Sequence, residues 1–490
     1  MDGKGHDTME QEYGSDLTGF FKPKSIALVG VSRSGDALGG LSFLRRFIEW
    51  GYKGALYPIN PKAGEVLGIR VYPDLESLPE VPELVIICVK AARVPVVLRE
   101  CCRLSIRFVH ILTAGFSEIG TEEGRRLEDE IASIARGGNL LVMGPNCMGP
   151  YCPSTGLTAW GATPGFDGKL GIISQSGGIT QRLTEFVTSL GVGVSKAASI
   201  GNATVLDSPE YLKFMGDDDD IELIAMYLES VRDGRRLMRC AGEVTPRKPI
   251  ILLKGGRSKE GASTAASHTG GMAGDLKLWD AFFAQTGATS VSTIDEWADA
   301  IVAFSHFPRT RGGGVFIIGG GGGNSVIFSD LTIEEGLAVP GLSDESMKKI
   351  RPIVPVAGSI AGNPLDFWES FTSADRLCEL LDIAYHDPHV HMVIADRLIP
   401  RIAFHSPEIP DAVPRISEFI RTHERKKPTA FTIDYDGGDA DLIAKGSTLR
   451  RSFCLAGIPA YPSFERAVRA LAHFQRYCGW TERQRRECAV

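Results

Sequence analysis

Short runs of β-branched and aliphatic residues alternate with longer amphipathic stretches through most of this sequence. A short apolar run favours a buried strand, and an amphipathic stretch between two such runs favours a crossover helix. The repeated pattern therefore predicts an α/β protein built on parallel sheets. Because 490 residues exceed what one hydrophobic core usually serves, we expect three domains, at residues 1–150, 151–310 and 311–490.

The expected strands follow directly from these runs. In chain order they are residues 25–31, 55–59, 84–89, 108–112 and 140–143, then 170–173, 193–199, 223–228 and 250–254, and finally 315–318, 390–395 and 429–433. The first series has the form of a Rossmann-like domain. The polar tail, residues 481–490, is expected to be frayed.

The composition excludes several classes of protein. A hydrophobic fraction of 43% with 23% charged residues is typical of a globular chain. The net charge of -7 argues against broad binding to nucleic acid or to an anionic membrane. Its 10 cysteines lack the spacing of zinc ligands and are expected to be reduced thiols. With a polar N-terminus and no long apolar run, the chain is predicted to be cytoplasmic.

A nucleotide-type site is expected after the first strand. Residues 30–35 (GVSRSG) would turn backbone N–H groups toward a phosphate, although a tight turn needs glycine with or without a ligand. The second strand runs into residues 57–62 (YPINPK), so Lys62 stands where an NAD site usually has an acid. A lysine suits the additional phosphate of NADP or CoA, and the alternative is a solvated loop lysine.

A histidine in a loop of small residues is the sharpest chemical signal. Residues 267–275 (SHTGGMAGD) leave the imidazole of His268 open to close approach. Imidazole is nucleophilic near neutral pH, so the loop suits phosphohistidine chemistry. The rival run at residues 386–391 (HDPHVH) suggests metal ligands at His386, His389 and His391. We predict no metal site there, because strand alternation separates neighbouring side chains and no further ligand pattern accompanies them.

Two other features complete a phosphoryl site. Residues 174–178 (SQSGG) follow a strand and open a helical stretch at residues 179–190, which directs N–H groups at a phosphate. Glu229 ends a buried strand, where α/β proteins form ligand sites. Its carboxylate could accept the second imidazole N–H and orient the ring, and the alternative is a surface loop acid.

Set in order, these motifs resemble the α subunit of succinyl-CoA synthetase and, more closely, the ADP-forming acetyl-CoA synthetase family. The likeness runs from about residue 20 to residue 480. Its most specific marks are residues 144–149 (GPNCMG), 174–178, 227–229 (YLE) and 267–274. The resemblance implies a Rossmann-like CoA-binding domain followed by two flavodoxin-like, succinyl-CoA synthetase-like parallel-sheet domains, the last of the CoA-ligase type.

The resemblance also implies roles for individual residues. His268 would carry the phosphate and Glu229 would orient it. The CoA-binding residues would be Ser32, Arg33, Ser34, Lys62, Val89, Thr113, Asn146 and Cys147. The phosphate-binding residues would be Ser176, Gly177, Gly178, Thr269, Gly270 and Gly271.

The implied reaction converts a small carboxylate, ATP and CoA to acyl-CoA, ADP and phosphate through a phosphohistidine and an acyl phosphate. Single-chain members of the family continue into an ATP-grasp domain, and no such pattern is found here. ATP, ADP and Mg²⁺ are therefore expected on a separate ATP-grasp β subunit, in an α2β2 assembly. Gln181 stands where succinyl-CoA synthetase has a tyrosine, which argues against succinate.

Two other functions stay open at this point. The same domains could form a non-catalytic CoA-binding regulatory subunit, although sensing would need neither His268 nor Glu229. A lysine at position 62 also suits an NADP-dependent dehydrogenase, which would change the nicotinamide absorbance in the presence of a carbonyl substrate.

Overall fold

The protein forms two compact units. The computed structural model describes residues 16–32, 39–62, 64–157, 160, 166–263, 276–319, 321–355, 359–367, 370, 373–396, 408–434 and 439–487. The first unit comprises Met1–Arg182, Val194–Lys248 and Lys254–Phe282. The second comprises Leu183–Gly193, Pro249–Leu253 and Phe283–Val490.

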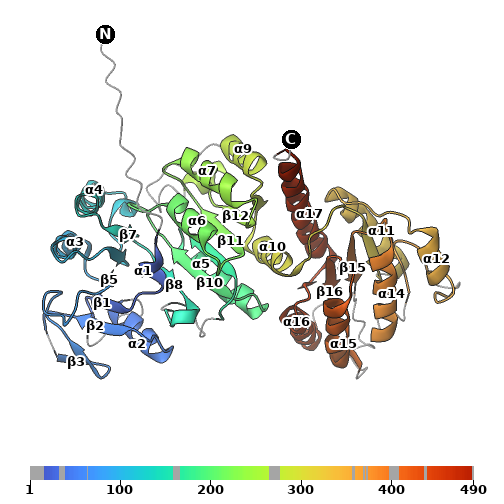
Figure 1. The fold of residues 1–490 in the computed structure, drawn as a ribbon, viewed down its shortest axis with the longest axis horizontal. Coiled ribbons are helices and arrows are strands. Elements are labelled where there is room, and N and C mark those ends of the chain that lie inside the picture. The colour runs from blue at the N-terminus through green and yellow to red at the C-terminus, as the bar shows by residue number, and fades with distance from the viewer. Residues whose placement is uncertain are drawn as a thin grey trace, which may run out of the picture. The chain divides into compact units, whose positions relative to one another are not determined.

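The first unit begins with a five-stranded parallel sheet of order β2-β1-β5-β6-β7 (Figure 1). Its strands are β1 (Ser25–Val29), β2 (Ala55–Ile59), β5 (Leu84–Ile87), β6 (Phe108–Ile111) and β7 (Leu141–Met143). Parallel strands need crossover connections, which here include α2 (Gly40–Glu49), α3 (Val94–Arg103) and α4 (Glu122–Gly137). The apolar faces of α3 and α4 pack with the strands in one buried cluster. The crossovers therefore build the core.

A second set of strands in this unit carries much of the site. These are β8 (Gly149–Tyr151), β9 (Leu170–Ser174), β10 (Val194–Ser199) and β11 (Leu223–Leu228), and every residue in them is buried. β9 pairs in parallel with β10 and β11, and β8 runs antiparallel to β10. α6 (Ser208–Asp217) and α7 (Gly234–Val244) pack together. The carboxyl ends of β9 and β11 therefore meet at one edge.

The second unit has its own parallel sheet, of order β14-β15-β16-β17. Its strands are β14 (Val315–Ile318), β15 (Met392–Asp396), β16 (Thr429–Thr432) and β17 (Ala460–Tyr461). The accompanying helices are α10 (Ile294–His306), α11 (Gly321–Glu334), α12 (Asp344–Ile350), α14 (Ala374–His386), α15 (Glu408–Thr422), α16 (Ala440–Leu455) and α17 (Phe464–Glu487). α17 packs along α10, where the rings of Phe304 and Phe474 meet edge to face at 5.2 Å.

The remaining elements are shorter or connect these layers. They are α1 (Thr18–Phe21), the antiparallel pair β3 (Gly64–Val66) and β4 (Ile69–Val71), α5 (Gly177–Ser189), α9 (Leu276–Thr286), and β12 (Ile250–Lys254) with its parallel partner β13 (Thr289–Val291). Three short 3₁₀ turns, Ala91–Arg93, Ser117–Ile119 and Pro153–Thr155, complete the described structure. None of its helices has both the length and the apolar character needed to cross a membrane.

The strands predicted from the sequence are all present, with ends that differ by up to two residues. The sequence missed β3, β4, β8, β13 and β17, which span only two or three residues each. The predicted fraying after residue 480 is wrong, because α17 continues to Glu487. Thr481 is buried in that helix and its hydroxyl donates to the Cys478 carbonyl at 2.9 Å.

A buried ion pair in the second unit generates a stability prediction. Arg466 donates from Nε and Nη2 to the two oxygens of Asp299 at 2.5 and 2.8 Å. Burial raises the Asp299 pKa and Arg466 opposes that shift. Arg466→Met leaves the carboxylate buried and unpaired, so the free energy of unfolding should fall by about 3 kcal/mol in chemical denaturation.

The matched control is Arg469→Met in the same helix. Arg469 pairs with Glu335 at 2.9 Å, but its side chain is half-exposed. An exposed pair contributes less than about 1 kcal/mol. Equal losses in the two variants would show that burial does not govern the Arg466 contact.

Candidate active site

A cavity of about 450 Å³ lies in the first unit beside the N-terminus of α5. Its lining comes from the segments that follow β5, β6 and β7, from the first turn of α5 and from the residue before α2. The lining residues are Gly39, Cys88, Val89, Leu112, Thr113, Ala114, Asn146, Cys147, Met148, Gly177 and Gly178. Six of them were predicted to bind CoA or phosphate, namely Val89, Thr113, Asn146, Cys147, Gly177 and Gly178. The fold thus brings two predicted groups of residues to one cavity.

Hydrogen bonds tie the cavity loops together. The Thr113 hydroxyl donates to the Val89 carbonyl at 2.6 Å, and the Asn146 backbone N–H donates to the Thr113 carbonyl at 2.9 Å. Asn146 has a φ of 58°, a left-handed conformation that asparagine tolerates better than most residues. Gly144 has a φ of 101°, and a Cβ there would lie 2.6 Å from the Ile111 carbonyl oxygen. The backbone therefore requires glycine at this position.

Cys147 is a lining thiol that burial keeps protonated. Burial raises the pKa of its thiol well above the ordinary value. The neighbouring His110 is fully buried, and burial lowers its pKa to about 4. The ring is therefore neutral near pH 7, and its Nε2 lies 3.2 Å from the Cys147 carbonyl oxygen. This pair supports the loop and lacks the activated thiolate that a nucleophilic cysteine needs.

The N-terminus of α5 opens on the cavity through its glycines. The Ser176 hydroxyl accepts the Ile179 backbone N–H at 3.3 Å, as a helix-capping side chain does. A Cβ on Gly178 would meet no atom within 4 Å, so this residue adjoins open space. A Cβ on Gly177 would lie 2.5 Å from Met148 Cγ. The helix presents its positive dipole end to a space that fits an anion.

Glu229 follows β11 and has one free carboxylate oxygen. The Tyr227 hydroxyl donates to Oε1 at 2.9 Å. Oε2 is buried and has no hydrogen-bond partner within the described part of the chain. A buried oxygen without a donor is costly, so Oε2 is available to accept a hydrogen bond.

Gln175 fixes the backbone of Glu229. Its Oε1 accepts the N–H groups of Glu229 and Ser230 at 2.6 and 3.0 Å, and its Nε2 donates to the Ser230 carbonyl at 2.9 Å. Gln175 also lies two residues before Gly177. It therefore connects the carboxylate to the helix N-terminus at the cavity.

The segment that leads to His268 begins against Glu229. Lys254 donates from Nζ to the Glu229 carbonyl at 2.8 Å, and burial lowers the pKa of this lysine while the Glu229 charge opposes that shift. A Cβ on Gly255 would lie 2.6 Å from the Tyr227 hydroxyl and 3.1 Å from Glu229 Cγ. The predicted residues His268, Thr269, Gly270 and Gly271 lie outside the described residues, which stop at 263 and resume at 276.

The predicted nucleotide end lies apart from the cavity lining. Ser32 and Lys62 are exposed, and neither lines the cavity. Asn60 joins their segments, because its Nδ2 donates to the Val31 carbonyl at 2.7 Å and its Oδ1 accepts the Lys62 N–H at 2.9 Å. The described residues stop at 32 and resume at 39, so they exclude Arg33 and Ser34. The first described helix after β1 begins at Gly40.

The sequence missed several residues of the site. Cys88 and Leu112 lie at the carboxyl ends of predicted strands and directly follow β5 and β6, so their position at a strand end was an available signal. The sequence has no such signal at Asn202. Its Oδ1 accepts from Asn146 at 3.3 Å, and its Nδ2 donates to Glu128 at 3.0 Å. This contact links the cavity loop to a buried acid that is remote in sequence.

Comparisons with known proteins place these features in a family. Residues 24–153 match the CoA binding domain, and residues 167–304 match the succinyl-CoA ligase like flavodoxin domain. The acetate–CoA ligase (ADP-forming) I subunit alpha of Pyrococcus furiosus is 34% identical over 95% of this chain and 98% of its own length. The chain belongs to the ADP-forming acyl-CoA synthetase α-subunit family. It is thus part of an acid–thiol ligase, and the predicted family, fold class and ligase function are confirmed.

Two other members of this acyl-CoA synthetase family extend the comparison. The 4-hydroxybutyrate–CoA ligase (ADP-forming) of Nitrosopumilus maritimus is 32% identical over 94% of this chain and 64% of its own length. A dinucleotide-forming acetyl-coenzyme A synthetase 1 from Ca. Korarchaeum cryptofilum was solved in complex with phosphate and ADP. It superimposes with a TM-score of 0.86 at 28% identity, covering 97% of this chain and 100% of that chain. The fold and the order of domains are therefore shared along nearly the whole chain.

The Gln175 contacts generate a prediction about this synthetase site. Gln175→Ala leaves the N–H groups of Glu229 and Ser230 without their acceptor, which should cost about 1–3 kcal/mol of stability. The displaced carboxylate should lower kcat for acyl-CoA formation by about 10- to 100-fold. CoA affinity, measured by calorimetry, should change little because Gln175 does not line the cavity. The exposed control Glu222→Ala should leave all three quantities unchanged; an equal loss of CoA affinity in Gln175→Ala would contradict the assignment.

Proposed function

We propose that this chain binds CoA in the 450 Å³ cavity and carries a phosphoryl group on His268 during acyl-CoA synthesis. One observation carries the proposal: residues predicted separately for CoA and for phosphate line the same cavity. Gln175 joins that cavity to Glu229, whose buried Oε2 is available to a donor. The substrate class is a small carboxylic acid.

The proposed chemistry proceeds in three balanced steps. The imidazole of His268 attacks the γ-phosphorus of ATP, forming an N–P bond and releasing ADP. The carboxylate then attacks phosphohistidine, giving an acyl phosphate and restoring the ring. Finally the CoA sulfur, having lost its proton, attacks the acyl carbonyl and expels phosphate. The phosphoryl group is transferred first to His268 and then to the carboxylate. CoA therefore reacts with an activated acyl phosphate, and the unfavourable direct reaction of a carboxylate with CoA is avoided.

The proposed role of Glu229 follows from its free oxygen. Oε2 would accept the N–H of the His268 ring and so direct the opposite nitrogen at phosphorus. The carboxylate would also stabilise the positive charge that develops on the ring as the N–P bond forms. The N-terminus of α5, at Ser176, Gly177 and Gly178, would stabilise the phosphoryl group through its dipole and N–H groups. Thr269, Gly270 and Gly271 would extend that cradle.

We propose further that ATP, ADP and Mg²⁺ bind to an ATP-grasp β subunit in an α2β2 assembly. Two comparisons support a partner. The P. furiosus relative is named an α subunit and matches this chain over 98% of its length. The 4-hydroxybutyrate ligase matches over 64% of its own length, so a third of that enzyme has no counterpart in the aligned region.

The site argues against a purely regulatory subunit. A CoA sensor needs the cavity but does not need a buried carboxylate oxygen beside the segment that leads to a histidine.

The described cysteines are free, which supports the proposed cytoplasmic location, where thiols stay reduced.

Histidine labelling tests the proposal without the partner. The reverse half-reaction, acyl-CoA with radiolabelled phosphate, should phosphorylate the wild-type chain at His268, and a panel of acyl-CoA thioesters allows for the unknown acid. His268→Ala should give no label while it binds CoA normally. Glu229→Gln should be labelled about 100-fold more slowly, because an amide cannot stabilise the charged ring. Label in His268→Ala, or a wild-type rate in Glu229→Gln, would overturn the corresponding role.

Lys62 generates a separate prediction about the nucleotide end of CoA. Asn60 holds the Lys62 loop beside the strand end at Val31. If Lys62 contacts the ribose phosphate, Lys62→Ala should weaken CoA about tenfold and leave dephospho-CoA almost unaffected. Calorimetry with both ligands decides the point. The control is Lys53→Ala, another lysine of the same domain outside the predicted site, and equal losses for CoA and dephospho-CoA would place Lys62 elsewhere.

A further inference from the structure

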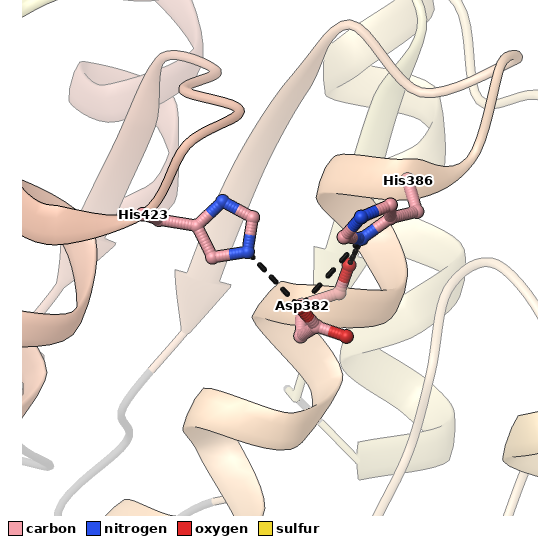
Figure 2. A group of neighbouring side chains, drawn as sticks. All are labelled: Asp382, His386 and His423. Atoms are coloured by element: carbon pink, nitrogen blue, oxygen red, sulfur yellow. Dashed lines mark hydrogen bonds and ion pairs between the residues drawn. The ribbon is translucent and has the colours of Figure 1, made fainter.

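Two imidazoles and a carboxylate meet in the second unit, outside the proposed active site. Asp382 and His386 are four residues apart on α14 and therefore lie on one face of the helix. His423 comes directly after α15 and turns its ring toward them (Figure 2). One nitrogen of each ring and one oxygen of Asp382 lie within 4.8 Å of one another.

The spacing of these atoms matches the first shell of a zinc-like ion. Asp382 Oδ1 lies 3.0 Å from His423 Nε2 and 3.6 Å from His386 Nδ1. Ligand atoms at roughly 2.0–2.2 Å from a tetrahedral ion are about 3.3 Å apart from each other. The two observed separations fall on either side of that value. Small side-chain adjustments would bring all three atoms onto one ion.

Hydrogen bonding at His423 leaves a place for a cation. Arg425 contacts Nδ1 of this ring through two backbone groups: its carbonyl oxygen lies 2.7 Å from Nδ1, and its N–H donates to Nδ1 at 3.1 Å. In the tautomer that donates Nδ1–H to the Arg425 carbonyl, Nε2 has a lone pair that faces Asp382 Oδ1 at 3.0 Å. Two electron pairs at that distance repel unless a proton or a metal ion lies between them. A histidine that donates Nδ1–H to a carbonyl is also the usual second-shell arrangement of metal ligands.

Packing holds the His423 ring in position before any ion binds. Its side chain is only 9% exposed. The Tyr385 ring meets it edge to face at 5.0 Å, and the Phe419 ring lies 5.1 Å away. Tyr385 is itself fixed by a 2.7 Å hydrogen bond with Thr429. Because the ring is already ordered, binding an ion costs less conformational entropy.

The surrounding charges also favour a cation. Asp382 makes ion pairs only with the two histidines among the described residues. Glu424 Oε1 lies 3.9 Å from His386 Nε2 and adds a second carboxylate. The site lies at the C-terminal, negative end of α14.

We propose that Asp382, His386 and His423 bind one divalent transition-metal ion of the zinc class. Two imidazoles select such an ion over Mg²⁺ or Ca²⁺, which prefer oxygen ligands. Water completes the coordination. His386 exchanges its 2.9 Å bond to the Asp382 carbonyl for the metal bond. The ion joins the end of α14 to the segment after α15 and so stabilises the second unit.

This site differs from the histidine run considered in the sequence. His389 Nδ1 lies 3.0 Å from the Gly341 carbonyl oxygen, and His391 Nδ1 accepts the Gly314 N–H at 3.3 Å. These two rings therefore turn to other partners. Of that run, only His386 belongs to the cluster. The second ligand, Asp382, lies on the same helix, and the third, His423, comes directly after α15.

Zinc titration of the full chain tests the proposal. The protein is first treated with chelator and kept reduced, and Zn²⁺ binding is followed by calorimetry and by metal analysis after dialysis. Wild type should bind one more equivalent of Zn²⁺ than Asp382→Asn or His386→Ala, or bind it about 100-fold more tightly. Zn²⁺ in tenfold excess over Kd should raise the Tm of wild type and not that of the variants.

His389→Ala is the matched control, since it removes an exposed histidine three residues from His386 without touching the cluster. It should bind Zn²⁺ as wild type does. Asp382 and His386 are at least one-third exposed, so both variants should fold, and circular dichroism checks this. If Asp382→Asn and His386→Ala retain wild-type stoichiometry and affinity, the ion binds elsewhere and the proposal fails. If wild type binds no Zn²⁺, the cluster is an ion pair between Asp382 and protonated histidine, and the proposal fails.

Discussion

The parallel register of β9 and β11 is the constraint on which the proposed active site depends. Ser174 pairs with Tyr227, so the residues that follow the two strands emerge side by side. Gln175 can then hold the backbone of Glu229 and Ser230 with three hydrogen bonds. One strand end leads to the helix N-terminus of α5 and the other to the carboxylate. A shift in register would separate the two groups.

A buried polar network supports the loop after β7, which lines the cavity. Asn146 contacts Asn202, and Asn202 contacts Glu128. Burial raises the Glu128 pKa, but hydrogen bonds from Ser117 and Asn202 outweigh it, so that the pKa is lowered. The ionised carboxylate also pairs with Arg232 at 3.0 Å, three residues after Glu229. Because every contact strengthens its neighbours in a buried setting, the network holds the cavity loop and the Glu229 loop in a fixed relation.

Each unit has a carboxylate near a histidine or near the segment that leads to one, and the proposed consequences differ. In the first unit, a carboxylate oxygen without a donor lies beside the segment that leads to a histidine, which supports reversible phosphorylation. In the second unit, a carboxylate oxygen and one nitrogen from each of two imidazoles lie within 4.8 Å of one another, which supports metal binding. The two proposals differ in the number of imidazoles at the carboxylate, which is one at Glu229 and two at Asp382. A single ring can be oriented and remain nucleophilic, whereas two rings and a carboxylate form a chelate.

The sequence by itself determined the α/β class and its buried strands, because apolar runs and their spacing are local properties of the chain. The motif at residues 174–178 predicted Gly177 and Gly178 because it follows a strand, and the resemblance to a known family predicted Val89, Thr113, Asn146 and Cys147. Tertiary structure alone decided that these residues share a cavity, that Gln175 holds Glu229, and that Asn202 reaches Glu128. It also decided that Asp382 and His423, and not His389 and His391, form a cluster with His386. Such contacts join residues tens of positions apart, and their geometry depends on strand register and helix packing, which no local pattern encodes.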